Sequence, residues 1–479
     1  MPRRLVAALL AAASLAGCSM APPYRPPAVQ AAPAFKEAGP WVAADPRLPG
    51  DGHWWAPFGD PVLDGLEQKV ATANPTLQGA LGRYQQAQAY LGEIRSDLLP
   101  QVSVSANATR NRQSADRPLR GGGPDYYGSD TVAGSVSWDL DLWGGLRNRV
   151  AAGKAEVAAS GDDLAAIRLA LEAQVATSYV QLRGLDAQAQ LLAATVEAYS
   201  RADDLTHRRF KGGIASGIDI ARSGALLADA RAQLADVAAA RALVEHAIAS
   251  LVGEPASSFS IAAVDAQPTL PTLPVGVPST LLQRRPDIAA AERRMFAANA
   301  GIGVARAAFF PSLSLGGSGG FQDTALAGLI AAPNALWSVG PTALLTLLDG
   351  GRHRAELAAA RAAWTQATAS YRGQVLQAFQ DVEDSLAQLH HFADEAQAEA
   401  DAVRLAGQTE QLALNRYEKG VVTYLDVSTA QATALEARRK ALDLRTRRLQ
   451  ASIGLIRALG GGWQDGNVQQ AEAAQPDKG

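Results

Sequence analysis

A few residues of this 479-residue chain have types and spacings that could support chemistry. The run from Gly316 to Gly320 satisfies the G-x-S-x-G pattern of serine hydrolases. That pattern needs a strand followed directly by a helix, whereas Ser318 lies among glycines beside an expected β-hairpin loop. His390 and His391 are adjacent, so they do not share a helix face as i, i+4 metal ligands would. We therefore expect no catalytic residue, no metal site and no cofactor.

The only cysteine, Cys18, follows a segment with the features of an export signal. Two arginines near the start precede an apolar stretch from Leu5 to Leu15, which has the length of a signal-peptide core. The residues Leu-Ala-Gly directly before Cys18 resemble a bacterial lipobox, although an unpaired reactive thiol is the alternative. We expect residues 1–17 to be removed and Cys18 to be lipidated. Ser19 replaces the aspartate that would indicate retention at the inner membrane, so the outer membrane is favoured.

The bulk composition excludes some classes of function. The formal net charge is −3, so no strong positive field favours binding to nucleic acid. Alanine is abundant and only 19% of the residues are charged, which favours long, closely packed helices. Beyond the signal segment no apolar stretch is long enough for a membrane helix. A mature protein that crosses a membrane must therefore do so as strands.

An internal repeat divides the chain into two similar halves, which are offset by about 210 residues. The segment from Arg209 to Ile214 aligns with the segment from Arg416 to Val421, and an aspartate follows each segment, at Asp219 and Asp426. Two copies are too few for a solenoid, which generally needs about three units.

Each half has the same expected order of elements. An opening helix ends at a proline, two strands with alternating apolar side chains form a hairpin, and two long helices form an α-hairpin. Apolar residues at steps of three and four in the long helices are typical of coiled-coil packing. We expect opening helices at 75–98 and 286–308, strands at 101–109, 132–143, 312–321 and 337–347, and first long helices at 147–211 and 352–418.

The repeat and the proline-rich connectors predict six segments. These are a signal peptide at 1–17, an acylated proline-rich segment at 18–60, the first structural repeat at 61–253, a proline-rich linker at 254–278, the second structural repeat at 279–462 and a polar tail at 463–479.

Four membrane strands per chain require several copies of the chain. Open strand edges in lipid leave backbone groups unpaired at a cost of several kcal/mol each, and about eight strands are the usual minimum for a barrel. Three chains give twelve strands and a lumen. The predicted fold is mainly α-helical with a transmembrane β-barrel, in a homotrimer whose long helices pack side by side below the barrel.

Aromatic residues near the expected strand ends suit an interfacial belt at the membrane surface. They are also ordinary in soluble β-structure, so both interpretations stay open. The residues are Tyr126, Tyr127, Trp138, Trp143 and Trp337.

Several sequence blocks carry a family resemblance. They are Leu273 to Pro278, Leu282 to Ile288, Ala297 to Ala300 and Ile302 to Pro311, with Trp54-Trp55 and Phe58 to Pro61. Together they resemble the outer membrane factor family, in its NodT-type lipoprotein efflux branch. The resemblance implies a barrel continuous with a periplasmic α-helical barrel. It also implies a passive exit channel of a tripartite pump, with a periplasmic membrane-fusion adaptor and an inner-membrane RND-type transporter as partners.

The resemblance implies a periplasmic gate at the hairpin tips. Aspartates of the family ring the entrance at the position of Asp426, and Asp219 is its repeat mate. Ser216 and Thr423 stand three positions earlier, so both aspartates also fit a capping box that satisfies a helix N-terminus. Gate and cap both stay open. Thr429 occupies the place of a second family aspartate, so a two-ring gate is not expected.

Adaptor docking is the second expected role of the tips. The resemblance places adaptor contacts around an aromatic-x-x-glycine turn, which corresponds here to Phe210, Gly213, Tyr417 and Gly420. The alternative is that both glycines only end helices and both aromatics only pack.

Two rival functions use the same elements. One is an outer-membrane channel for type I protein secretion. The other is a structural periplasmic lipoprotein whose helices act as a spacer, in which case the four strands would not contact lipid.

Overall fold

A computed structural model describes residues 19–28, 34–37, 53–114, 116, 122–264, 267–271 and 284–463. The predicted signal peptide, Cys18, part of the linker and the tail after Trp463 lie outside these residues. The chain folds into two compact units, each assembled from distant segments. Unit 1 contains Met1–Ala28, Arg83–Ser160 and Ala290–Arg372, and unit 2 contains Val29–Gly82, Gly161–Ala289 and Gly373–Gly479.

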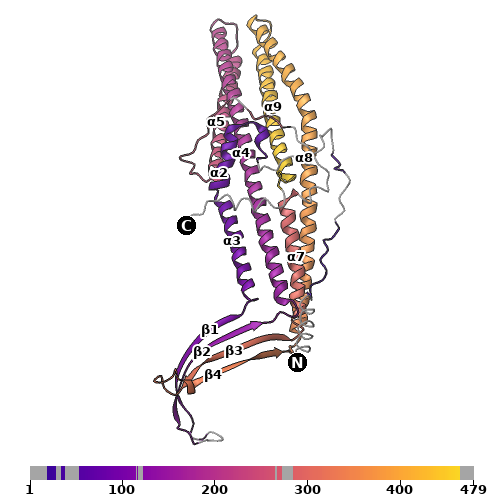
Figure 1. Cartoon of the computed structure of the whole chain (residues 1–479). Coiled ribbons are helices and arrows are strands. Elements are labelled where there is room, and N and C mark those ends of the chain that lie inside the picture. Colours follow the sequence, from indigo (N-terminus) through magenta and orange to yellow (C-terminus); the bar gives the residue numbers. More distant parts are fainter. Residues whose placement is uncertain are drawn as a thin grey trace. The chain divides into compact units, whose positions relative to one another are not determined.

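The two halves of the chain repeat one order of elements, opening helix, β-hairpin and α-hairpin, as predicted (Figure 1). The first half contains η1 (Ala56–Phe58), α2 (Pro61–Ala73), α3 (Pro75–Ser96), β1 (Gln101–Arg112), β2 (Tyr126–Asp139), α4 (Gly145–Lys211) and α5 (Gly217–Leu251). The second half contains α7 (Pro286–Ala307), β3 (Ser312–Asp323), η2 (Ala332–Asn334), β4 (Ala335–Leu344), α8 (Arg352–Glu418) and α9 (Tyr424–Ala458).

The long helices match each other closely. Both α4 and α8 have 67 residues, and both α5 and α9 have 35. Among the described residues, no helix combines the length and the apolar character that crossing a bilayer would need.

The prediction of the return strand at 132–143 is wrong at both ends. Strand β2 begins at Tyr126, because the two strands of the hairpin continue past the predicted end and pair Tyr126 with Arg112. It ends at Asp139, and Asp141 lies in the connection to the next helix, α4, which begins at Gly145. The Asp141 carboxylate accepts hydrogen bonds from the backbone N–H groups of Leu146 and Arg147, at 3.0 and 2.8 Å, and so caps α4.

The four strands form one antiparallel sheet in the order β1-β2-β3-β4 (Figure 1). The register places apolar side chains opposite one another on one face, for example Val102 opposite Val136. Serines and threonines predominate on the other face, where Ser103 Oγ lies 2.8 Å from Ser135 Oγ. Both faces of the sheet are largely exposed in the single chain. On the apolar face, Val104 is 77% exposed.

The aromatic residues near the strand ends differ in environment. Trp337 is 79% exposed on β4, as a residue of an interfacial belt would be in an isolated chain. Trp143 instead stacks on Phe310, with ring centres 4.7 Å apart, and donates its indole N–H to the Pro311 carbonyl. Trp143 therefore packs within unit 1 and joins the sheet to the helices.

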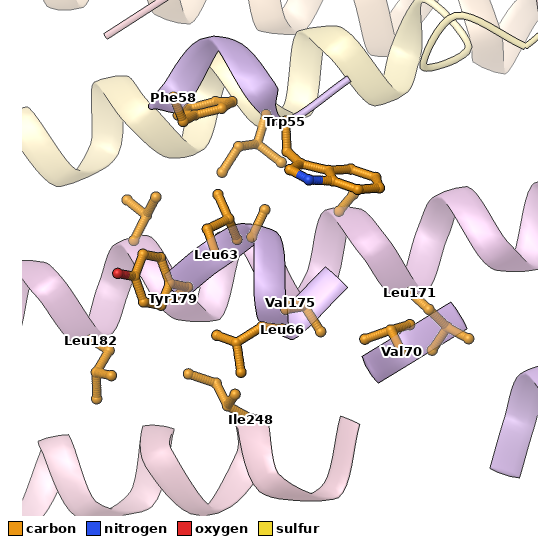
Figure 2. Close-up of a cluster of buried hydrophobic side chains, with 14 of the residues drawn as sticks. Trp55, Phe58, Leu63, Leu66, Val70, Leu171, Val175, Tyr179, Leu182 and Ile248 are labelled. Atoms are coloured by element: carbon orange, nitrogen blue, oxygen red, sulfur yellow. The ribbon is translucent and has the colours of Figure 1, made fainter. Parts of the chain in front are cut away.

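Helix α2 is an element that sequence reasoning missed, and it lies in the main core of unit 2. Asp60 caps it by accepting the backbone N–H groups of Val62 and Leu63, and Pro61 occupies its first turn. Figure 2 shows that Leu63, Leu66 and Val70 of this helix pack toward side chains of α4, α5 and η1. The core residues labelled there are Trp55, Phe58, Leu63, Leu66, Val70, Leu171, Val175, Tyr179, Leu182 and Ile248.

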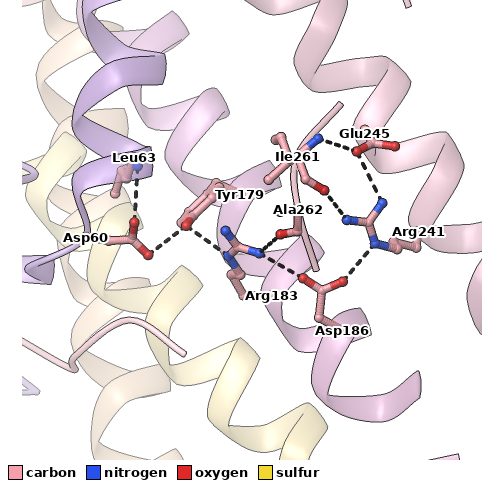
Figure 3. A network of polar contacts seen from close by, with 9 residues as sticks. All are labelled: Asp60, Leu63, Tyr179, Arg183, Asp186, Arg241, Glu245, Ile261 and Ala262. Atoms are coloured by element: carbon pink, nitrogen blue, oxygen red, sulfur yellow. Dashed lines mark hydrogen bonds and ion pairs between the residues drawn. The ribbon is translucent and has the colours of Figure 1, made fainter. Parts of the chain in front are cut away.

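A buried polar network fixes the segment that follows α5 (Figure 3). Arg183 donates to the Tyr179 hydroxyl at 2.9 Å, to Asp186 at 2.9 Å and to the Ala262 carbonyl at 2.8 Å. Arg241 of α5 reaches Asp186 at 2.8 Å. Since Arg183 and Asp186 are both buried, these charge-assisted bonds hold the start of the linker in one place against the helices.

Candidate functional site

The turns at the two hairpin tips have the same geometry. Gly213 and Gly420 have φ values of 72° and 75°, in the left-handed region that favours glycine. In each turn the glycine N–H bonds to the carbonyl three residues earlier, and the next N–H bonds to the carbonyl five residues earlier. This is the Schellman pattern that ends a helix, as the sequence predicts for both glycines.

The two aspartates predicted at the gate form capping boxes. Asp219 accepts the backbone N–H of Ser216 at 2.9 Å, and its own N–H bonds to the Ser216 hydroxyl. Asp426 accepts the backbone N–H of Thr423 at 3.2 Å and the Thr423 hydroxyl at 3.1 Å. Each carboxylate therefore satisfies the N-terminus of α5 or α9. A gating role for the same charges stays a prediction.

The two aromatic residues of the predicted docking turns differ in burial. Phe210 is 47% exposed, whereas Tyr417 is 4% exposed. The Tyr417 hydroxyl lies 3.3 Å from Thr206 Oγ1, and its ring contacts Tyr424 edge-on at 5.5 Å. Tyr417 therefore packs between the two hairpins, and of these two aromatic residues only Phe210 offers an exposed apolar surface to a partner.

Arg209 connects the two tips, a role that its place in the repeated segment does not indicate. Its guanidinium lies over the Tyr417 ring, with Cζ 4.4 Å from the ring centre, and donates a hydrogen bond to the Tyr417 carbonyl. A cation over an aromatic face is attracted by the electron-rich ring. Arg209, near the end of α4, thus binds Tyr417, near the end of α8.

A small cavity of about 290 Å³ lies between the two turns. Arg209 and Asp219 supply opposite charges to its wall. The Tyr424 hydroxyl is buried there and has no hydrogen-bond partner among the described residues. Burial, together with the nearby Asp203 carboxylate, raises the pKa of Tyr424. The lining residues are Arg209, Ile214, Ala215, Asp219, Tyr417, Gly420, Val421, Val422, Thr423 and Tyr424.

The predicted lipidation site, Cys18, lies outside the described residues, but the segment directly after it docks on helices α4 and α7. The Ser19 hydroxyl donates to Asn148 at 2.8 Å, and the Pro22 carbonyl accepts a bond from Asn299 at 2.9 Å. A Cβ at Gly303 would lie 2.8 Å from the Ala21 nitrogen, so glycine makes room for this close approach. We call residues 19–24 the N-terminal strap.

Further along the N-terminal strap, Tyr24 packs edge-on against Phe296 of α7, at 5.1 Å between ring centres. Its hydroxyl reaches Glu292, and the Met20 carbonyl accepts a bond from Arg306 at 3.2 Å. The strap thus runs along α7 and contacts both the side chains and the backbone of that helix.

Comparisons with known proteins agree with this architecture. The family model described as outer membrane efflux protein matches residues 66–254 and 277–461. Among curated relatives, the probable efflux pump outer membrane protein SepC of Pseudomonas putida is 33% identical over 96% of this chain and 97% of its own length. Outer membrane protein OprJ of Pseudomonas aeruginosa is also 33% identical, over 96% of each chain.

Solved structures show the same fold. The outer-membrane channel OprN has a TM-score of 0.87 and 28% identity, and the match covers 93% of this chain and all of that one. The open-state MtrE outer membrane channel of Neisseria gonorrhoeae has a TM-score of 0.82 and 28% identity, with 93% and 99% covered. These matches confirm the predicted fold class, outer-membrane location and efflux role. Two repeats, a four-stranded sheet and both matched segments of the family model lead to one conclusion: the chain belongs to the outer membrane efflux protein family.

Proposed function

We propose that three copies of this chain form a passive exit duct in the outer membrane for the cargo of an efflux pump. The observation that carries the proposal is the two-faced sheet. The apolar face, with Val102, Val136 and Val339, suits lipid, and the face rich in serine and threonine suits a water-filled lumen. An exposed apolar face of this kind marks an interaction surface, and in this proposal the surface that it contacts is the membrane.

The unpaired edges of the sheet support the assembly. Strand β1 and strand β4 each pair on one side only within the described chain. In lipid these edges need partners, and β1 of one copy can pair with β4 of the next. Three copies close the wall with twelve strands and leave a lumen, whereas two copies would give about eight strands and a lumen filled by side chains.

Adjacent substitutions on β4 test the two faces. Val339→Arg places a charge on the apolar face, at a cost of about 2–4 kcal/mol per chain near the bilayer centre. We expect loss of this variant from the outer membrane. Ser338→Arg, one residue away, should insert normally and change the ion selectivity of the channel in planar bilayers. Normal insertion of Val339→Arg would contradict the assignment of the lipid face.

The energy for transport comes, in this proposal, from elsewhere in the pump. A periplasmic membrane-fusion adaptor and an inner-membrane RND-type transporter deliver small molecules to the duct, which needs no catalytic group. The names of relatives, such as the toluene efflux pump outer membrane protein TtgF of Pseudomonas putida, support small-molecule cargo. Drug accumulation in a deletion strain tests this assignment. Complementation with the wild-type gene should lower accumulation, and an unchanged level of every compound would overturn it.

Docking of the adaptor belongs to the hairpin tips. Phe210 offers the exposed apolar surface, and Gly213 and Gly420 keep the turns tight. We expect Phe210→Ala to weaken co-purification with the adaptor, while the channel still assembles. Tyr417→Phe keeps the buried ring and serves as the control, since it should leave adaptor binding unchanged. Equal adaptor binding by Phe210→Ala and wild type would remove Phe210 from the interface.

Cys18 carries the acyl chains in this proposal. The docked N-terminal strap supports it, because Ser19, the residue directly after Cys18, is held at a defined place by its hydrogen bond to Asn148 of α4. Radiolabelled palmitate should be incorporated by the wild type and absent from Cys18→Ala. Labelling of that variant would exclude the site.

A further inference from the structure

Three side chains that can bind metal share one exposed surface of α8. One ligand atom from each of His390, His391 and Asp394 lies within 4.8 Å of the others. The two imidazole ring centres are 5.2 Å apart, and the rings are inclined by 64°. Asp394 stands one helical turn after His390, so these two residues face the same way. The pair His390-His391 in the sequence does not by itself indicate that the Asp394 carboxylate lies beside the two imidazole rings.

Within the described residues of the single chain, all three side chains are without polar partners. Each is exposed, and in the part of the chain that the structure describes none of them makes a hydrogen bond or an ion pair. No existing polar contact has to be broken when an ion binds. The helix backbone fixes the three Cβ positions, so that only side-chain rotation is needed to bring the ligand atoms together.

The equivalent surface in the first half of the chain is packed. Helices α4 and α8 have equal lengths, and the three ligand positions correspond to Arg183, Gly184 and Ala187 of α4. Arg183 is buried in its ion pair with Asp186, and a Cβ at Gly184 would lie 2.3 Å from Thr446 Oγ1. His390, His391 and Asp394 thus occur on the copy of this surface that is open in the single chain.

We propose that His390, His391 and Asp394 bind one divalent transition-metal ion, of the Zn²⁺ or Cu²⁺ type, at the surface of α8. Imidazole nitrogen suits both ions, and a carboxylate completes a mixed nitrogen and oxygen set. Bonds of about 2.0–2.2 Å require ligand atoms roughly 3–4 Å apart. Small rotations from the present separations achieve this. The site leaves at least one coordination position to water.

Titration of the full-length, acylated protein in detergent with Zn²⁺ alone tests the proposal. Calorimetry should give one site per chain. His390→Ala and Asp394→Ala should each weaken binding by roughly tenfold or more, because loss of even an outer-shell partner costs about 10- to 100-fold. His246→Ala removes another exposed helical histidine, on α5, and should leave the affinity unchanged.

Cu²⁺ provides a spectroscopic check of the ligand set. Electron paramagnetic resonance should show coupling to two imidazole nitrogens in the wild type and to one in His391→Ala. The three residues are exposed, so circular dichroism should confirm that the alanine variants keep their helices. Binding that is equal in the wild type and in the variant with all three residues changed to alanine would overturn the proposal, as would a Cu²⁺ signal without nitrogen coupling.

Discussion

The guanidinium of Arg209 covers the ring of Tyr417, a residue of the other hairpin, and also bonds to its backbone carbonyl. We predict that Arg209→Ala loosens the tip, because it removes a stacked cation and a charged hydrogen bond, together about 2 kcal/mol. Single-channel recordings should show a higher conductance or more frequent opening. Arg208→Ala, which changes the exposed neighbouring arginine, should behave as wild type. Identical conductance in both variants would mean that this contact does not restrain the tip.

Asp426 offers a way to separate capping from gating. Asp426→Asn keeps a side-chain oxygen for the N-terminus of α9 but removes the charge, whereas Asp426→Ala removes both. We expect about 1 kcal/mol loss of stability for the alanine variant and little for the asparagine variant. If the carboxylates ring the entrance, both variants lose cation selectivity in bilayer recordings. Unchanged selectivity in Asp426→Asn would leave capping as the only role.

Two glycines of α7 provide a matched pair. A Cβ at Gly301 meets nothing within 4 Å, whereas one at Gly303 would lie 2.5 Å from Asn148 Nδ2. Gly301→Ala should therefore stabilise the helix by up to about 1 kcal/mol, the ordinary gain of alanine over glycine. Gly303→Ala should displace the N-terminal strap and destabilise the protein by about 1–3 kcal/mol. Limited proteolysis followed by mass spectrometry should find new cleavage before residue 25 only in the second variant.

Glu67 of α2 predicts an unusual dependence of stability on pH. Its side chain is fully buried, and neither carboxylate oxygen has a hydrogen-bond partner in the described structure. Burial, and after it the nearby Glu172 carboxylate, raise the pKa of Glu67 to about 10. The folded state therefore keeps a proton that the unfolded chain loses near pH 4.5. The free energy of unfolding should fall between these two pH values, by at most about 1.4 kcal/mol per pH unit.

Thermal unfolding of the wild type and Glu67→Gln between pH 5 and 9 measures this effect. The variant keeps the shape of the side chain but cannot ionise, so its Tm should fall less steeply with rising pH. Glu93→Gln, which changes an exposed carboxylate of α3, is the control and should follow the wild type. Parallel curves for the wild type and Glu67→Gln would show that Glu67 is not a neutral acid in the folded protein.

The helical framework could be predicted from the sequence because its signals are local. The predicted long helix at 352–418 coincides with α8, since an apolar stripe runs along it and Gly420 marks its end. Helix α2 was missed although Asp60 and Pro61 form a recognisable start signal. The start of β2 at Tyr126 depends on pairing with Arg112 across a loop, which no single segment reveals.

The candidate site was harder to predict from the sequence for a related reason. Repetition identifies Phe210 and Tyr417 as equivalent residues, but their burial depends on what packs against each. Tyr417 is covered by Arg209 and Thr206, which lie more than 200 residues earlier in the chain. Such contacts have no periodic pattern, so the difference between the two tips emerges only in the folded chain.

The N-terminal strap sets an order of events during folding. Its residues are synthesised early, yet α7, which supplies much of the surface that holds them, is synthesised late. Pro22 bonds to Asn299, which follows it by 277 residues. Until α7 has formed, the strap can make only its contact with Asn148 of α4, so its remaining partners are missing while the chain is completed. The strap can therefore attach fully only after the chain has been synthesised through α7, the opening helix of the second half.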